Sequence, residues 1–361
     1  MSVVARRMAR HHLTVPGTSP AGVVRAMCGA HAQIASAAEL SIGLRLPGTT
    51  RRDVRDALWV DRTLVKTRGP RGTVHLLPAA DLPMWLGALA RLPADLGLLT
   101  PAQTDEVVAA IADALATAEL TAEELTAEVV ARTGSWAGDR VMDAFQDKWP
   151  RWMQALGVAA FRGALCHAPN KGRKTAYTSP ARWLPGVAPA PDGAERLVEA
   201  YLRAYGPARP EDFARWFGAP RRWVDGVFAR ADVQECGDGF VVRGDDVFPA
   251  DPPRGVWLLP YFDAFAVGCH PRAELFPGRA ATRALAGGQA GNFPVVLVDG
   301  VVAGVWHLRR SGRRVVVTVE VWDGLTPKRR RELADRVERV GEIVEASAEL
   351  VLGPVTVGPH A

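Results

Sequence analysis

The chain has 361 residues, 48% of them apolar, which excludes wholesale disorder and favours about two to four domains. Its formal net charge of +5 favours an anionic partner without requiring one, because arginine-rich usage often reflects genome composition. Four scattered cysteines exclude a dense disulfide framework and a Cys-x-x-Cys knuckle, so we expect reduced thiols and neither metal nor cofactor. The start lacks signal-peptide features and no apolar run can span a bilayer, so we expect a cytoplasmic protein.

The first polar motif lies between two predicted helices. One helix begins near Ser19 and another covers 34–45, and Gly29 can end the first. Side chains two residues apart diverge on a helix but share one side of an extended segment. His31 and Gln33 can therefore form a local pair only if this stretch is an extended connector. The alternative is that they cap helix ends.

Residues 50–78 predict a helix that leads into a hairpin. Thr50 and Asp53 fit a capping box, and the β-rich runs 64–68 and 73–77 are joined by a Gly-Pro-Arg-Gly turn. This is the pattern of a winged helix, whose hairpin tip commonly meets phosphates. The cations expected to crowd the tip are Lys66, Arg68 and Arg71. A solvated surface hairpin is the alternative.

A second unit is predicted between residues 91 and 180. Thr121 and Glu124 form another capping-box pattern, and an apolar stripe continues at helical spacing from Leu125 through Val141, Phe145, Trp149 and Trp152, with a kink at Pro150. Two short runs, 165–168 and 175–178, then predict a hairpin. Its tip carries three cations, Lys171, Arg173 and Lys174.

The third unit, 181–250, shows the pattern most clearly. After a Ser-, Pro- and Gly-rich linker, one helix presents Leu197 and Tyr201, a second opens at Pro210 and ends at Gly218, and a third starts at Pro220. A hairpin over 233–243 follows. Three helices and a hairpin are typical of a winged helix-turn-helix.

From about residue 251 the sequence becomes β-rich. Strands are expected at 256–259, 295–298, 301–307 and 315–321, with Asp299-Gly300 as a hairpin turn. A helix over 328–346 and a strand over 350–357 complete this part. We therefore predict an α+β fold: three tandem winged helix-turn-helix units over 1–90, 91–180 and 181–250, then a C-terminal β-barrel-like domain over 251–361.

Three segments carry a resemblance to a known family. LVKTR at 64–68 with RGTVHLLP at 71–78, YFDAF at 261–265 and VDGVVAGVWHLRR at 298–310 resemble the AlkZ/YcaQ-type winged-helix DNA glycosylases, in the right order over nearly the whole chain. The resemblance implies three winged helices and a β-barrel around duplex DNA, and excision of alkylated bases or unhooking of crosslinks. The family's pair is Gln-x-Gln or Gln-x-Asp, and the matching positions here are His31 and Gln33.

The resemblance implies a monofunctional, cofactor-free enzyme that hydrolyses the N-glycosidic bond of alkylated purines, with N7-alkylguanine, bulky adducts and interstrand crosslinks as candidates. Gln33 would hold the attacking water, and His31 would accept its proton or orient it. Alkylation at N7 puts positive charge on the base, so positioning and electrostatics suffice for catalysis. Whether the base flips or stays stacked is left open.

The expected partner is double-stranded DNA containing alkylated bases, bound by a monomeric, nucleoid-associated protein. Phosphate contacts are expected from the two cationic hairpin tips, and more weakly from Arg51 and Arg52 on a helix and from Arg309 and Arg310 at a C-terminal turn that equally keeps a sheet edge soluble. A non-catalytic alternative remains, either a winged-helix regulator or an inactive lesion-binding relative. No heptad or dimer helix is evident, which favours repair.

Other polar residues are weaker candidates. Cys28 and His31 have no orienting partner for nucleophilic catalysis. His75 lies in a strand, which favours a structural role, and Asp263 faces either the lesion or a buried hydrogen-bonding partner. His11 and His12 fall in a start that we expect to be mobile.

Overall fold

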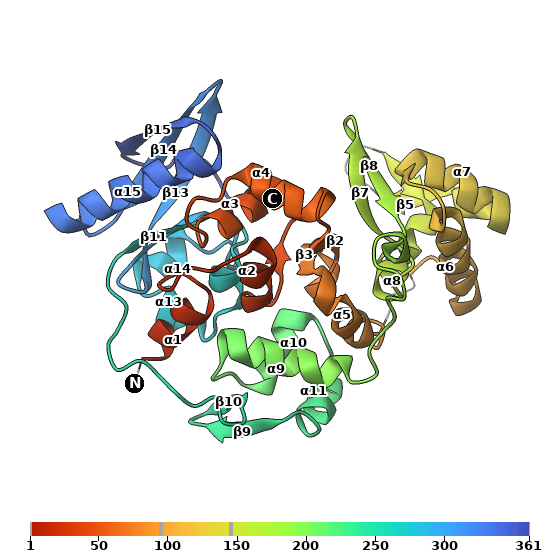
Figure 1. Cartoon of the computed structure of the whole chain (residues 1–361), viewed down its shortest axis with the longest axis horizontal. Coiled ribbons are helices and arrows are strands. Elements are labelled where there is room, and N and C mark those ends of the chain that lie inside the picture. The colour runs from red at the N-terminus through yellow and green to blue at the C-terminus, as the bar shows by residue number, and fades with distance from the viewer. Residues whose placement is uncertain (1, 94–96, 144–146, 361) are drawn as a thin grey trace.

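The computed structural model describes residues 2–93, 97–143 and 147–360. Figure 1 shows the N-terminal elements at the centre of the molecule. The elements of 101–178 lie to their right, those of 193–242 below, and the C-terminal sheet at the upper left. None of the helices in these described ranges is both long and apolar enough to cross a bilayer.

The N-terminal elements are α1 (Val3–Arg10), α2 (Pro20–Ala26), β1 (Ala30–His31), α3 (Ala35–Gly43), α4 (Arg51–Trp59), β2 (Leu64–Arg68), β3 (Val74–Pro78) and α5 (Leu82–Leu89). The capping box of Thr50 and Asp53 is confirmed at the start of α4, as is the hairpin of β2 and β3. The start is not mobile as expected: the fully buried His11 packs edge-on against Tyr205 and Phe265.

The first hairpin is part of a three-stranded sheet, and the structure corrects the prediction that Lys66 lies at the hairpin tip. β3 is the central strand of a sheet ordered β1-β3-β2, and β2 also contacts β7 of the second unit. Lys66 lies opposite Leu76 within β2 rather than at the tip, and it is half-buried. The connector strand β1 and the second unit thus flank the two edges of the hairpin.

The second unit contains α6 (Pro101–Leu115), β4 (Leu120–Thr121), α7 (Ala122–Thr133), β5 (Arg140–Asp143), β6 (Lys148–Pro150), α8 (Leu156–Phe161), β7 (Cys166–Lys171) and β8 (Lys174–Thr178). The capping box of Thr121 and Glu124 and the β7–β8 hairpin are confirmed. The helix predicted through Val141 and Trp149 is wrong, because these residues form the antiparallel pair β5 and β6. Trp149 is 51% exposed, so the helical spacing did not mark a buried face. Phe145 lies outside the described residues.

The third unit follows the predicted order of three helices and a hairpin. Its elements are α9 (Gly193–Tyr205), α10 (Pro210–Phe217), α11 (Arg221–Phe228), β9 (Val233–Cys236) and β10 (Gly239–Val242). Gly218 ends α10 in the left-handed region, with φ of 83°. The aromatic rings of Tyr201, Phe213 and Trp216 pack together between the helices.

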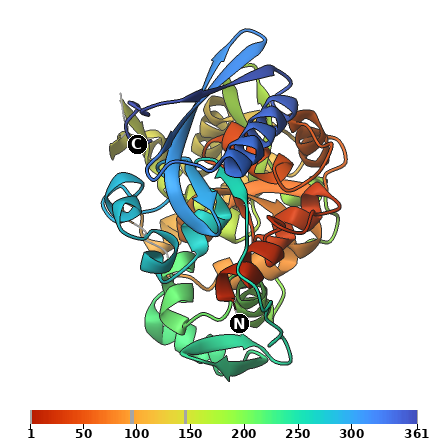
Figure 2. The same ribbon diagram turned by 90° about the vertical axis from the view of Figure 1, so that its left-hand side faces the viewer.

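The C-terminal part is a curled, half-barrel sheet of five strands. In order they are β11 (Val256–Leu259), β12 (Val295–Val298), β13 (Val301–Ser311), β14 (Arg314–Val321) and β15 (Ser347–Leu352). All neighbours are antiparallel except β14 and β15. Figure 2 shows the long β13–β14 hairpin projecting beyond the other elements. The last strand ends at Leu352, short of the predicted 357.

The helix predicted beside this sheet is α15 (Pro327–Ile343), which buries Leu333, Val337 and Val340 against the strands. Between β11 and β12 the chain forms the short helices α12 (Ala264–Gly268), α13 (Arg272–Leu275) and α14 (Arg279–Arg283). This insertion returns to the centre of the molecule. One apolar core joins it to the first and third units through Met8, Trp85, Tyr201 and Phe265, among others.

Candidate functional site

His31 lies in the short extended strand β1, which meets the condition set for a local pair with Gln33. Cys28 and Gly29 turn the chain after α2 with φ of 55° and 94°. A Cβ on Gly29 would lie 3.2 Å from a methyl of Leu77, so glycine suits this position on two counts. His31 then pairs with His75 across the β1–β3 ladder, and the N–H of Ala32 donates to the Val74 carbonyl at 2.7 Å. The ladder therefore fixes the backbone of His31.

Two aromatic rings fix the imidazole of His31. Phe262, from the loop after β11, stacks on it with centroids 4.5 Å apart and an interplanar angle of 27°. His75 meets it edge-on at 5.1 Å. Phe262 adopts φ of 54°, and its N–H donates to the Gly291 carbonyl at 2.9 Å. The C-terminal part thus supplies one wall for a residue of the N-terminal part.

Both neighbouring imidazoles are neutral near pH 7. Burial, together with the charge of Arg71, lowers the pKa of His31 to about 4, and its buried Nδ1 has no hydrogen-bond partner in the described parts of the chain. Burial likewise lowers the pKa of His75 to about 3, while its Nδ1 lies 3.0 Å from the Thr73 carbonyl oxygen. A neutral His31 can accept a hydrogen bond or a proton at a free ring nitrogen.

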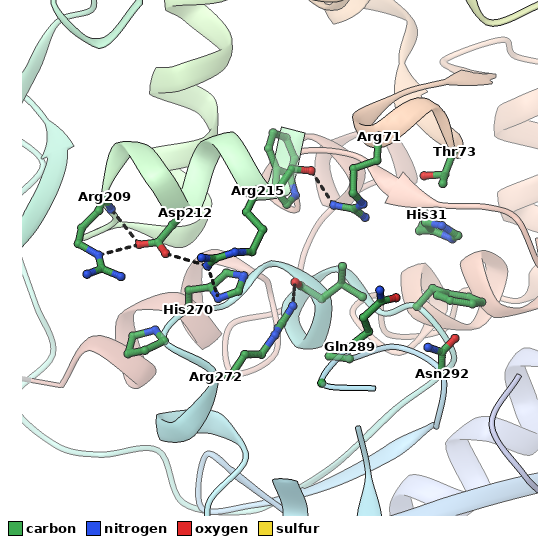
Figure 3. Close-up of a pocket in the computed structure, with 16 residues that line it drawn as sticks. His31, Arg71, Thr73, Arg209, Asp212, Arg215, His270, Arg272, Gln289 and Asn292 are labelled. Carbon is green, nitrogen blue, oxygen red and sulfur yellow. Dashed lines mark hydrogen bonds and ion pairs between the residues drawn. The ribbon is translucent and has the colours of Figure 1, made fainter. Parts of the chain in front are cut away.

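His31 lines a cavity of about 580 Å³ between the N-terminal part, α10 and the loops of the C-terminal insertion. Figure 3 shows His31 at one end and Arg209 with Asp212 at the other. Its lining residues are His31, Arg71, Thr73, Arg209, Asp212, Arg215, Trp216, Phe262, Val267, His270, Pro271, Arg272, Gly288, Gln289, Ala290 and Asn292. Gln33 is exposed nearby and is not among them. The structure therefore brings one member of the predicted pair to the cavity.

The three cations of the first hairpin differ in their burial and in their hydrogen bonds. Arg71 lines the cavity and donates to the Trp216 carbonyl at 2.6 Å. Arg68 is half-buried and donates to the Gly72 carbonyl at 2.8 Å. Burial lowers the pKa of Lys66, although Glu39 opposes this effect. Of the three, Arg71 alone is exposed, and it points at the candidate site.

The cations of the second hairpin are exposed, but two of them are paired. Lys171 lies 3.0 Å from a carboxylate oxygen of Glu124, and Lys174 lies 2.5 Å from one of Glu123. Both acidic residues belong to the first turn of α7. Arg173 occupies the turn between the strands and is exposed.

The four arginines that are weaker candidates for phosphate contact also differ in their exposure and contacts. Arg51 forms an ion pair with Glu345 at 2.9 Å and links α4 to the C-terminal part, whereas Arg52 is exposed. Arg309 is exposed on β13, and Arg310 donates to the carbonyls of Gly312 and Val344. Arg51 and Arg310 thus make contacts within the protein, whereas Arg52 and Arg309 are exposed.

The alternative catalytic candidates, Cys28 and Asp263, are buried in positions that favour structural roles. Burial raises the pKa of the Cys28 thiol well above its ordinary value, and Cys28 does not line the cavity. Asp263 is fully buried and accepts two hydrogen bonds from Arg45 and one from Ser41. Its carboxylate therefore anchors the segment that carries Phe262.

Sequence reasoning missed most of the cavity wall. Arg215, His270 and Arg272 each sit on a helix or loop whose local pattern gives no functional signal. Phe262 was identified only as part of the YFDAF segment. The sequence does not show that residues of β1, α10 and the insertion after β11 lie together, because only tertiary packing brings these elements into contact.

Comparisons with known proteins agree with this architecture. The family model described as "DNA glycosylase AlkZ-like" matches residues 24–343. An interstrand DNA cross-link repair glycosylase of Streptomyces sahachiroi is 32% identical over 333 residues, which are 85% of this chain and 87% of that protein. The solved structure of the Streptomyces sahachiroi DNA glycosylase AlkZ superposes with a TM-score of 0.80 at 28% identity, covering 97% of this chain and 98% of the other. The chain therefore belongs to the AlkZ-like DNA glycosylase family.

Proposed function

We propose that this protein is a monofunctional DNA glycosylase that hydrolyses the N-glycosidic bond of N7-alkylguanine in duplex DNA. The main support is the placement of His31, a neutral imidazole held between Phe262 and His75 at the wall of a large cavity. A neutral ring offers a lone pair to water, which a protonated ring does not. Family membership supports the same reaction class.

In the proposed reaction, His31 orients the attacking water and accepts its proton as the water oxygen bonds to C1′. With a pKa near 4, His31 is a weak base at neutral pH, so its contribution lies mainly in orientation. This is sufficient because N7 alkylation makes guanine a cationic leaving group. The bond between C1′ and N9 breaks, its electron pair leaves with the base, and the sugar keeps the water oxygen.

Gln33 is proposed as the second water ligand. It is exposed two residues beyond His31 in the connector, so bound DNA rather than the protein would bring its amide to the reacting centre. Catalytic geometry in free enzymes often tightens only in the substrate complex. No covalent intermediate with the protein is needed, which makes the enzyme monofunctional.

We infer that the helix and hairpin groups act as winged helices that hold the duplex through phosphates. Exposed arginines lie on three separated elements: Arg173 at the β7–β8 turn, Arg52 on α4 and Arg309 on β13. Lys171 and Lys174 can exchange their carboxylate partners for phosphates, because solvent screening leaves exposed ion pairs weak. Interstrand crosslinks are proposed as further substrates, since a relative is described as a cross-link repair glycosylase.

The test is release of N7-methylguanine from a methylated duplex, scored as alkali-labile sites. The wild-type protein should release the base, and His31→Ala should lose about 100-fold or more in rate with duplex affinity nearly unchanged. Arg203→Gln, an exposed α9 position outside the cavity lining, is the control and should match the wild type. Binding of the methylated duplex without release would instead identify a lesion-binding relative.

A further inference from the structure

The two ends of the cavity are lined by side chains of different chemistry. Its His31 end presents the ring of Phe262 and the amide of Asn292, whereas its far end gathers charged side chains from α10 and the insertion after β11. The lining contains four arginines and one carboxylate. Arg209 is paired with that carboxylate, Asp212, at 3.3 Å and with Glu211 at 3.2 Å, so the excess of positive charge comes mainly from the other three arginines. Burial lowers the pKa of His270 to about 4, so that ring adds no charge near pH 7.

The arginines differ in how much of their hydrogen-bonding capacity is used. Arg272 donates to the carbonyls of Ala266, Val267 and Cys269 and is thereby fixed. Among the residues that the structure describes, the polar contacts of Arg215 are long, 3.5 Å to the Asp212 carboxylate and 3.5 Å to the His270 ring. Figure 3 shows its guanidinium beside Asp212 and His270, at the end of the cavity away from His31. Arg215 is therefore a donor group with most of its N–H bonds available.

The geometry of a purine relates this end of the cavity to the lesion. N7 lies on the major-groove edge, whereas N9 carries the sugar. If His31 acts at C1′, a substituent on N7 extends away from His31. A methyl group needs no more than a small apolar space, but about 580 Å³ is the size of a small-molecule site.

We propose that the end of the cavity formed by Arg209, Arg215 and Arg272, called here the arginine subsite, binds an anionic oxygen group on the substituent of N7-alkylated guanine. This proposal rests on the proposed function and narrows its substrate class. Guanidinium groups recognise carboxylate-like oxygens through paired N–H donors, and a cavity with excess positive charge penalises a cationic group. A phosphate of the DNA backbone has the same chemistry, so the test separates the two sources.

The test uses three duplexes that differ only in the N7 substituent: methyl, carboxyalkyl, and aminoalkyl of the same chain length. Excision rates at limiting enzyme give kcat/KM for each. Affinities are measured in parallel with 2′-fluoro sugars, which resist glycosidic cleavage, so the subsite is assessed even if no base is released. The variants are Arg215→Gln and Arg215→Glu, with Arg203→Gln as the control for removal of one exposed arginine. Arg215 is 60% exposed, so its replacement should not disturb folding.

The wild type should prefer the carboxyalkyl over the aminoalkyl duplex by about tenfold or more in affinity and in kcat/KM. Arg215→Gln should remove most of this preference, Arg215→Glu should reverse it, and Arg203→Gln should keep it. Equal handling of both adducts by the wild type would overturn the subsite. So would an equal loss for all duplexes, including undamaged DNA, in Arg215→Gln, because that result assigns the arginines to backbone phosphate. Absence of base release from every duplex would count against the proposed glycosylase activity, while the affinities would still decide the subsite.

Discussion

Arg45 and Asp263 form a bidentate ion pair, with both N···O distances 2.8 Å and both side chains fully buried. Arg45 follows α3 in the N-terminal part, and Asp263 directly follows Phe262 in the C-terminal part. Burial alone would raise the pKa of Asp263, but the charge and hydrogen bonds of Arg45 outweigh burial and hold it below its usual value. The pair fixes the position at which Phe262 meets His31.

Removing one charge of this pair should destabilise the fold. Asp263→Asn leaves the Arg45 guanidinium buried without a counter-charge, and we expect a loss of about 3–5 kcal/mol in the free energy of unfolding. Urea denaturation measures the change. Asp232→Asn removes a carboxylate from the exposed pair with Arg243 and should cost no more than about 1 kcal/mol. Similar losses in both variants would show that the buried pair has no special role.

Stability should fall as pH is lowered from about 6.5. Burial lowers the pKa of His11 and of His75 to about 3 each, so both stay neutral in the fold while the unfolded chain binds protons near pH 6.5. The unfolded state then gains protons that the folded state lacks, which favours unfolding increasingly down to about pH 3. Urea midpoints at pH 7.5, 6.5 and 5.5 check this, and a midpoint unchanged down to pH 5.5 would contradict it.

The His31→Gln variant should retain measurable activity, and its rate should no longer fall at acidic pH. A glutamine amide still offers an oxygen to the water but does not titrate, whereas His31 protonates near pH 4 and then stops accepting. The wild-type rate, corrected for uncatalysed release, should be level from about pH 8 down to pH 5.5 and fall below that. A fall centred on the ordinary histidine value near 6.5 would show that burial does not control this residue.

Phe262 should act as a positioning residue. Phe262→Leu removes the ring that stacks on His31 but leaves an apolar side chain with the same left-handed backbone requirement. We expect kcat to fall about tenfold or more with little change in duplex affinity, because only the orientation of His31 is lost. Tyr261→Leu is the control, since the Tyr261 ring faces His360 rather than His31. Equal effects on kcat and on affinity would indicate general damage to the loop.

Replacing Lys171, Arg173 and Lys174 together should weaken duplex binding and flatten its salt dependence. If all three contact phosphates, the slope of log K against log salt should fall by roughly 2.7, and by roughly 0.9 if only the unpaired Arg173 does. The ion pairs with Glu123 and Glu124 favour a value between these limits. An unchanged slope would remove this hairpin from the contact surface. Glu123→Gln and Glu124→Gln together should strengthen binding, because they release both lysines.

The elements that could be predicted from the sequence are those specified by interactions between residues close together in the chain. The capping boxes at Thr50 and Thr121, the hairpin turn at Asp299-Gly300 and the buried stripe of α15 all depend on residues within a few positions of one another. Backbone preference and local hydrogen bonds are sufficient to specify such elements. The prediction failed around Val141 because apolar residues at helical spacing are compatible with a strand pair when no buried face requires a helix.

The tertiary structure alone decided the site. The sequence left open whether His31 lies in an extended connector or caps a helix, and it contained no sign that Phe262 would stack on it or that Arg71 would line the cavity. These contacts join segments far apart in the chain, and their free energy comes from burying surface in one shared core. Local preferences therefore fixed the elements, while packing selected which side chains meet around the cavity.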